Sequence, residues 1–261
     1  MGVVNVTPDS FSDGGRLLTS ADAIAHGRRL AAEGAALVDV GGESTRPGAE
    51  PVDEEEELRR VVPVLQGLAE VAVSIDTSKS GVAKRALELG AELVNDVTAL
   101  RADPELVDVV AAADAYVCLM HMQGEPRTMQ VAPQYDDVVG DVLAFLEERL
   151  AYATDGGVRE ERICVDPGIG FGKTPDQNLE LLRRLDELGA LGRPVLVGAS
   201  RKSTLAKILG DPSATGGLAA SLAAAVAAFT RGAAMIRAHD VRETVEALAV
   251  AAAVEHGRIT A

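Results

Sequence analysis

The chain has 261 residues, of which 47% are hydrophobic and only 3% aromatic, and it carries a net charge of −15 at pH 7. This length suits a single domain over residues 1–261 and leaves no room for a second domain of comparable size. The acidic balance argues against nucleic acid or an anionic membrane surface as a partner, because both attract clustered Lys and Arg. With no charged and apolar leader and no apolar run of about 18 residues, we expect a cytoplasmic protein without a membrane span.

Eight short runs of β-branched or apolar residues recur along the chain, and each ends in polar residues before an alanine-rich amphipathic stretch. The runs lie at residues 1–5, 36–41, 71–76, 93–96, 115–121, 162–166, 194–200 and 234–239. They are typical of parallel strands that are buried on both faces by helices. Eight such units close most simply into a (β/α)8 TIM barrel, an α/β fold in which the C-terminal ends of all strands meet on one rim.

Helix start signals follow several of these runs. Thr174 and Gln177, with a proline in the first turn, predict a capping box, and Asp240 with Glu243 predicts a second one. The acidic block at residues 53–57 opens an amphipathic stretch, where negative charge complements the helix dipole. We therefore interpret this block as a solvated helix start and not as a metal site.

Three connections on the predicted rim are longer than turns require. They lie at residues 6–19, 43–52 and 122–134 and are rich in Pro, Gly, Ser and Thr. Long connections of this kind are often lids or binding loops. We therefore expect mobile loops above the C-terminal ends of the strands.

Polar residues that are distant in sequence fall at the predicted strand ends, so the barrel should bring them into one pocket. They are Asn5, Asp76, Asn95, Asp166, Lys202, Arg237 and His239. A single acid such as Asp39 or Asp96 could simply cap a helix, and the grouping carries the inference. Asp76, Asn95 and Asp166 suit a planar heterocycle that bears amino and NH donors, while Lys202 can donate to its carbonyl or ring nitrogen.

A second subsite is predicted where the first and the last strand meet. Arg237 and His239 follow the eighth strand and Asn5 ends the first. These two strands are neighbours in a closed barrel, at the place where barrels commonly bind phosphate. The three residues therefore predict an anion site beside the heterocycle slot.

Three other features carry less weight. The stretch GIGFGKT at residues 168–174 resembles a phosphate-binding P-loop, but its glycine interval is one residue short and a proline stands where the first glycine is needed. Ser200 lies near Lys202, yet no acyl-transfer signature accompanies the pair, so we expect a positioning role. Cys118 and Cys164 lie in predicted strands outside any metal-binding pattern, and we expect buried, reduced thiols.

Seven short motifs, spread in order over essentially the whole chain, together resemble the dihydropteroate synthases of folate biosynthesis. They are NVTPDSFSDGG at residues 5–15, GGESTRPG at 41–48, SIDT at 74–77, NDV at 95–97, DPG at 166–168, SRKS at 200–203 and RAHD at 237–240. The first two are the most specific, because related pterin-binding methyltransferases share the Asp/Asn/Asp slot without them. One departure is Thr98-Ala99, where Ser-Gly is frequent in the family.

The resemblance implies a transferase that condenses 7,8-dihydropterin-6-ylmethyl diphosphate with p-aminobenzoate, giving 7,8-dihydropteroate and diphosphate, with Mg²⁺ on the diphosphate. It also implies a role for individual residues. The pterin would be held by Asp76, Asn95, Asp166 and Lys202, with Met120, Phe171 and Gly198 lining the slot and Arg237 flanking the ring. The diphosphate would be held by Asn5, Arg237 and His239, with Asn5 as the direct Mg²⁺ ligand. The p-aminobenzoate site would be shaped by Phe11, Thr45, Arg46, Pro47 and Ser203. The family usually dimerises through its helices, so a homodimer is expected.

The chemistry fits the same residues. A methylene on an electron-rich pterin can ionise before the amine attacks, because the ring delocalises the cation, and the enzyme then mainly stabilises separated charges. Mg²⁺, Arg237 and His239 would take the negative charge on diphosphate, with Asp76 near the positive methylene.

Two alternatives stay open from the sequence. A pterin-dependent methyltransferase would share the heterocycle slot but would need no diphosphate site, and the loops at residues 6–19 and 43–52 favour the synthase. A paralogue that binds pterin without catalysis should lack Asn5, Lys202 or the residues of the anion site, and all of these are present.

Overall fold

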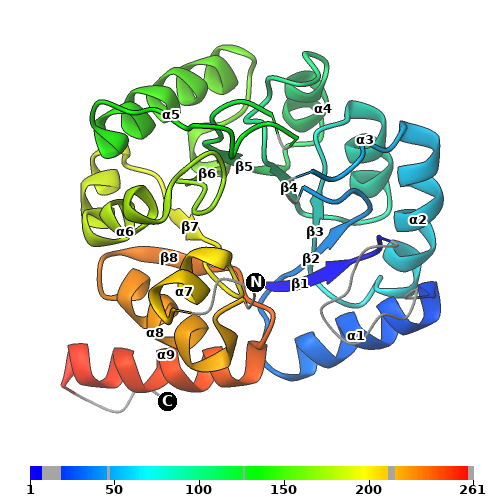
Figure 1. Cartoon of the computed structure of the whole chain (residues 1–261). Helices are drawn as coiled ribbons and strands as arrows, with labels where there is room; N and C mark the ends of the chain where they lie inside the picture. The colour runs from blue at the N-terminus through cyan, green and yellow to red at the C-terminus, as the bar shows by residue number, and fades with distance from the viewer. Residues whose placement is uncertain (8–18, 46–47, 126, 211–214, 258–261) are drawn as a thin grey trace.

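Eight parallel strands, paired in chain order, form one sheet in the computed structural model, which describes residues 1–7, 19–45, 48–125, 127–210 and 215–257. The strands are β1 (Gly2–Asn5), β2 (Val38–Gly41), β3 (Val73–Asp76), β4 (Leu93–Asp96), β5 (Tyr116–Met120), β6 (Ile163–Asp166), β7 (Val195–Val197) and β8 (Ala233–Ile236). Gly2 pairs in parallel with Ala238, whose amide donates to the carbonyl of Met1 at 2.9 Å. The last strand segment therefore meets the first, and the sheet curls into the predicted barrel (Figure 1).

Helices surround the sheet and separate consecutive strands (Figure 1). They are α1 (Ser20–Ala32), α2 (Glu54–Gly67), α3 (Ser80–Glu88), α4 (Leu106–Ala112), α5 (Val138–Asp155), α6 (Pro175–Arg183), α7 (Ser203–Ile208), α8 (Gly217–Phe229) and α9 (Val241–His256). Short 3-10 turns lie at Glu160–Arg162 and Leu185–Leu191. None of the helices in the described part of the chain is both long and apolar enough to cross a membrane. The expected alternation of strands and helices is confirmed.

The core is aliphatic, in keeping with the 3% aromatic content of the sequence. One apolar cluster lies between the sheet and the helices α1 to α5, and a second lies between the sheet and the helices α5 to α8. Inside the barrel, Leu93, Cys118, Cys164 and Leu196 pack together below the rim. Both cysteines are buried free thiols, as expected.

Two of the strands end three residues earlier than expected. The sequence predicted strands over 194–200 and 234–239, whereas β7 and β8 end at Val197 and Ile236. A register shift between Val195 and Leu196 interrupts the pairing of these two strands. The residues that follow β7 and β8 therefore leave the ladder early and reach the rim as connecting segments.

One of the two predicted capping boxes is confirmed and the other is wrong. Thr174 and Gln177 bond each other's backbone amides at the start of α6, with proline in the first turn. Asp240 precedes α9 but makes no side-chain cap bond. Its carboxylate instead accepts hydrogen bonds from the Arg201 guanidinium at 2.6 and 3.1 Å. An ion pair with a neighbouring segment has taken the side chain away from its own helix.

The acidic block opens α2 as predicted, but it is not solvated throughout. The side chain of Asp53 accepts a hydrogen bond from the Glu56 amide and caps the helix. Glu57, however, is fully buried and pairs with Lys79 at 2.6 Å. Glu57 therefore belongs to the packed layer between α2 and the sheet, and the interpretation of the whole block as a solvated face was wrong.

The three long connections are present. Their described parts contain no helix or strand. The connection that begins at residue 43 leaves β2 beside the end of β3, because Gly41 pairs with Asp76. Whether these loops move stays a prediction.

Candidate active site

The register of the sheet brings the predicted polar residues together at the barrel mouth. Asp76 pairs with Asn95 between β3 and β4, and Met120 pairs with Asp166 between β5 and β6. Residues that pair in a parallel sheet point to the same face, so these side chains share the barrel interior. All four are buried. The structure therefore places Asp76, Asn95 and Asp166 around one opening, as the sequence predicted.

Arg237 links the two sides of this opening. Its Nε donates to Asp39 Oδ2 at 2.6 Å, and its Nη2 donates to Asp76 Oδ2 at 3.0 Å. The Asn95 amide also donates to Asp39 Oδ2, at 3.1 Å. Gly198 lies alongside, because a Cβ there would stand 3.7 Å from the Arg237 Cβ. Arg237 is thus held between two carboxylates by contacts that fix the direction of its side chain.

Asp39 is a site residue that sequence reasoning missed. It is fully buried, and its second oxygen, Oδ1, has no hydrogen-bond partner within the described structure. It lies two residues before the end of β2 and so points into the barrel one layer below the rim. The alternation of the strand was the available signal, since a charged residue on the inward face must be paired to be tolerated.

Burial sets the protonation of the opening. Loss of water raises the pKa of Asp76 to about 8, with a further increase from nearby Asp39, while Arg237 opposes the shift. Burial also raises the pKa of Asp166. Desolvation lowers the pKa of Lys202 to about 8, against the attraction of Asp166. Asp76 and Lys202 can therefore change charge near neutral pH at the barrel mouth, which is common at catalytic sites.

Lys202 lies across the turn that follows β6. Its ammonium donates to the carbonyl of Ile169 at 2.5 Å and lies 4.2 Å from the centre of the Phe171 ring. The same turn begins with a hydrogen bond from the Gly168 amide to Asp166 Oδ1 at 2.7 Å. Gly170 packs against the Lys202 stem with φ of +85°, a conformation that favours glycine. The turn therefore fixes the ring and the ammonium relative to Asp166.

Lys173 is a second residue that sequence reasoning missed as a site residue. Its side chain is buried, and its Nζ lies 2.9 Å from the carbonyls of Gly168 and Phe171 and 2.8 Å from His121 Nδ1. A P-loop directs amides toward a phosphate, whereas this turn directs carbonyls toward a lysine of the chain itself. The resemblance to a P-loop was correctly set aside, and Lys173 instead holds the turn in shape.

The apolar wall of the opening is built from methionines. Met120 packs in one cluster with Val97, Met122 and Met129, and Phe171 lies against this cluster. Methionine adapts to flat rings because its chain is unbranched and its sulfur is polarisable. Met120 and Phe171 were predicted to line the slot, and the structure brings them together in this cluster.

The predicted anion residues lie on the opposite side of the mouth. Asn5 ends β1 and pairs with Gly41. His239 follows β8, and its amide and its Nδ1 both lie within 3.2 Å of Ser200 Oγ. Ser200 therefore orients His239, which supports the expected positioning role of this serine. The closure of the barrel places the segment after β8 beside β1, as predicted.

The residues predicted for p-aminobenzoate are less gathered. Thr45 is half-buried beyond the end of β2, and Ser203 is exposed at the start of α7. Phe11, Arg46 and Pro47 lie outside the described residues. The structure therefore locates two of the five and leaves their convergence a prediction.

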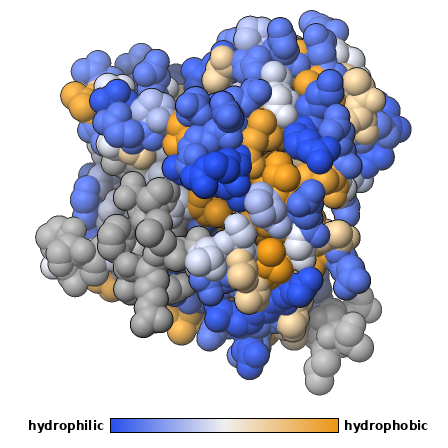
Figure 2. Space-filling model, turned by 90° about the vertical axis from the view of Figure 1, so that its right-hand side faces the viewer, coloured by the Kyte–Doolittle hydropathy of each residue, from blue (hydrophilic) through white to orange (hydrophobic). Residues whose placement is uncertain are grey.

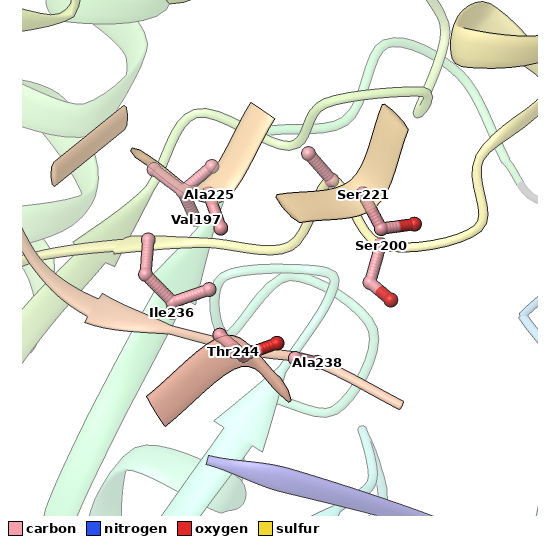
Figure 3. Close-up of a pocket in the computed structure, with 8 residues that line it drawn as sticks. Val197, Ser200, Ser221, Ala225, Ile236, Ala238 and Thr244 are labelled. Carbon is pink, nitrogen blue, oxygen red and sulfur yellow. The ribbon is translucent and has the colours of Figure 1, made fainter. Parts of the chain in front are cut away.

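A small cavity lies behind β7 and β8, between these strands and the helices α8 and α9 (Figure 3). Ser200, Ser221 and Thr244 supply its polar groups. Ser221 bonds the Arg201 amide and the Gly217 carbonyl, and Thr244 donates to the Asp240 carbonyl. These groups fasten helix starts to the rim, so the cavity supports the anion side from behind and is separate from the slot.

The donor set at Asn5 suits only a weakly anchored metal ion. Within the described residues, no group of three or more His, Cys, Asp or Glu side chains could hold a metal. Mg²⁺ often takes one or two protein oxygens and completes its shell with water and substrate phosphates. A single amide oxygen from Asn5 fits an ion that arrives with a diphosphate.

Comparisons with known proteins match a part of the chain that includes all of the predicted site residues. The sequence matches the family described as pterin binding enzyme over residues 1–239. The dihydropteroate synthase of Escherichia coli (strain K12) is 48% identical over 254 residues, which cover 96% of this chain and 89% of that protein. The Yersinia pestis dihydropteroate synthase, crystallised with a sulfonamide drug complex, has a TM-score of 0.93 at 44% identity and covers 98% of this chain and 93% of its own. The Xanthomonas albilineans dihydropteroate synthase with 4-aminobenzoic acid has a TM-score of 0.90 at 49% identity. This match covers 97% of this chain and 92% of that chain.

Proposed function

This chain belongs to the dihydropteroate synthase family of pterin binding enzymes, and we propose that it joins 7,8-dihydropterin-6-ylmethyl diphosphate to p-aminobenzoate, releasing diphosphate. The observation that carries the proposal is the gathering of Asp76, Asn95, Asp166 and Lys202 at one barrel mouth. The relative crystallised with 4-aminobenzoic acid supports the choice of the amine. The relatives reported above are synthases, which disfavours the alternative of a methyltransferase.

The buried polar residues fit one planar heterocycle. Asp76 and Asp166 offer carboxylate oxygens to amino and ring NH donors, and Asn95 offers an amide. Lys202 would donate to the ring carbonyl or a ring nitrogen, with Met120 on one wall and Phe171 beside it. Each buried donor or acceptor that finds its partner avoids a penalty of about 1–3 kcal/mol, so a pterin with the complementary pattern is selected over other flat rings.

Catalysis in this proposal is a separation of charge. The bond between the pterin methylene and the diphosphate oxygen breaks first, and its electron pair leaves with the diphosphate. The amine nitrogen then forms the new C–N bond and gives one proton to water or to the diphosphate. Asp76, in its ionised form, would stabilise the cation, and Arg237, already fixed by two carboxylates, would meet the departing anion without reorganising. No protein nucleophile is required.

The anion side would hold the leaving diphosphate. His239, oriented by Ser200, and Arg237 supply donors, and Asn5 would contribute one oxygen to Mg²⁺. When bound, Mg²⁺ would neutralise charge on the leaving diphosphate. Phe11, Thr45, Arg46, Pro47 and Ser203 would complete the p-aminobenzoate side.

The assembly we propose is a homodimer of single-domain barrels in the cytoplasm. Exposed apolar side chains occur in or directly beside the helices α7, α8 and α9. They include Ile208, Leu209, Leu218, Val245, Val250 and Val254. The face on the side of α1 to α3 is mostly hydrophilic, with apolar side chains gathered near the middle of the view (Figure 2). A contact through α7 to α9 would remove apolar surface from water. Two free buried thiols fit a reducing compartment.

A direct assay tests the function. Purified protein is incubated with the pterin diphosphate, labelled p-aminobenzoate and Mg²⁺, and the products are separated by chromatography. We expect labelled dihydropteroate and one equivalent of diphosphate. Binding of pterin without any product would instead support a non-catalytic paralogue, and methyl transfer from methyltetrahydrofolate to a corrinoid protein would support the methyltransferase.

A further inference from the structure

A charged cluster fastens the base of the second long connection, at residues 43–52, outside the pterin slot. Lys79 Nζ lies 2.5 Å from Glu43 Oε2 and 2.6 Å from Glu57 Oε2. The other oxygen of Glu43 accepts a hydrogen bond from the Val52 amide at 3.1 Å. One carboxylate at the start of the connection therefore holds both the far end of the same connection and a lysine from another segment.

The cluster occupies a place where charge is costly. Glu57 is fully buried, and its Oε1 has no hydrogen-bond partner among the described residues. Lys79 is about one-fifth exposed and stands immediately before α3. A buried ion pair is often no more stabilising than apolar residues of similar volume, so its use is better sought in the geometry that it imposes. Here the geometry joins three segments: the end of β2, the start of α2 and the start of α3.

The backbone around the cluster is also fixed. A Cβ on Gly42 would lie 2.8 Å from Val61 Cγ1 and 2.9 Å from Glu57 Cγ, so the chain runs directly against α2. Arg60 Nη1 donates to the Gly42 carbonyl at 2.8 Å. The connection thus leaves β2 at a defined point. The hydrogen bond from the Val52 amide to Glu43 then holds the far end of the connection close to its start.

This base adjoins the site. Gly41 pairs with Asp76 in the sheet, and Lys79 follows Asp76 by three residues. Thr45, on the p-aminobenzoate side of the proposed function, follows Glu43 by two. We propose that Lys79 and Glu43 are positioning residues that set the affinity for the aromatic amine without contacting the pterin. This inference rests on the proposed function.

Kinetics of Lys79→Met provide the test. The matched control is Lys84→Met, an exposed lysine on α3. We expect Lys79→Met to raise KM for p-aminobenzoate about tenfold while KM for the pterin diphosphate changes less than about twofold, because only the amine side is displaced. The control should leave both constants unchanged. Pterin binding by calorimetry and the thermal midpoint show whether the slot and the fold are intact.

A second variant keeps the test decisive if Lys79→Met fails to fold. Glu43→Gln keeps an oxygen for the Val52 amide but removes the ion pair, so we expect a smaller, about threefold, rise in KM for p-aminobenzoate. The double variant should resemble Lys79→Met alone, because Lys79→Met already removes the ion pair with Glu43. Equal changes in both KM values, or a loss of kcat alone, would overturn the inference. If the wild-type protein made no dihydropteroate, the proposed function itself would fail, which is a distinct result.

Discussion

The pterin slot and the p-aminobenzoate side are built in different ways. The slot groups stand on or directly after β3 to β8, and their positions follow from the register of the sheet and from bonds within the barrel. In the proposed function the amine side draws on the connections that leave β1 and β2, and contacts among Glu43, Val52 and Lys79 hold the base of the second connection. The proposed slot is therefore formed by the fold, whereas the proposed amine side would depend on a few local contacts.

This difference between the two sides explains why the pterin and the amine would bind in a fixed order. A slot made of strand ends exists before any ligand arrives and can bind the pterin first. Ordering a connection costs entropy, which a ligand bound beside it can offset. Asn5 ends β1 immediately before the first long connection, so a diphosphate held there would favour its ordering. The amine would then bind second, in a site that excludes water from the cation.

The largest effect should come from Arg237, which holds the slot together. Arg237→Met would leave Asp39 fully buried without its cation, and breaking such a pair costs about 3–5 kcal/mol of unfolding free energy. Urea denaturation and the product assay measure stability and activity. Arg242→Met, an exposed change on α9, is the control. Adding Asp39→Asn should restore part of the stability but not the activity, and a stable, fully active Arg237→Met variant would refute this role.

The next effect concerns the ammonium in the slot. Lys202→Ala removes charge-assisted hydrogen bonds worth about 1.5–3 kcal/mol, which corresponds to roughly tenfold to hundredfold weaker pterin binding. The fold should persist because Lys202 lies on the rim. Calorimetric titration with pterin measures the loss, with the exposed Lys207→Ala as control. Normal pterin affinity in Lys202→Ala would show that the residue is misassigned.

A smaller effect is expected from Lys173, which acts through the turn. Lys173→Met leaves the carbonyls of Gly168 and Phe171 without their donor, so we expect pterin binding to weaken about tenfold and stability to fall by about 1–3 kcal/mol. The affinity for p-aminobenzoate in the ternary complex should change less. If the amine side were affected more than the pterin, the division between the two sides would be wrong.

The last effect is a gradual dependence of stability on pH, which needs no substitution to observe. The pKa of Asp76 is raised in the folded protein to about 8, so the folded state holds a proton that the unfolded chain releases near pH 4. The free energy of unfolding should therefore fall as pH rises from about 5 to 8, by at most about 1.4 kcal/mol per pH unit for one proton. Buried Asp166 contributes in the same direction, and the lowered pKa of Lys202 acts oppositely only above about pH 8.

Denaturation at several pH values checks this dependence. Asp76→Asn should flatten the slope between pH 5 and 8, because its side chain cannot titrate. Asp108→Asn, an exposed change on α4, should retain the wild-type slope. Identical slopes in all three proteins would mean that Asp76 keeps an ordinary pKa in the folded state.

Much of the fold was predictable because its signals are local. A buried parallel strand is a short apolar run, and eight such runs followed by helical patterns leave few topologies. The convergence of Asp76, Asn95 and Asp166 followed from the barrel, since strand ends share a rim. The capping box at Thr174 was also readable, because both of its partners lie within one helical turn.

The errors and omissions arose where a distant partner decides what a side chain does. Asp240 has the sequence of a helix cap, yet Arg201 binds it. Glu57 stands in an acidic block, yet it is buried beside Lys79 from another element. Asp39 meets Arg237 from the far end of the chain, and Lys173 meets His121 from the neighbouring strand end, and no spacing along the chain encodes either contact.

The most direct test of the two-sided site is the binding of p-aminobenzoate with and without its partners. Calorimetry would compare the protein alone with the protein that already holds pterin, Mg²⁺ and diphosphate. We expect no measurable binding to the protein alone and clear binding to the loaded form, together with protection from proteolysis near residues 13–16. Equal binding of p-aminobenzoate to both forms would contradict a second site that depends on the first.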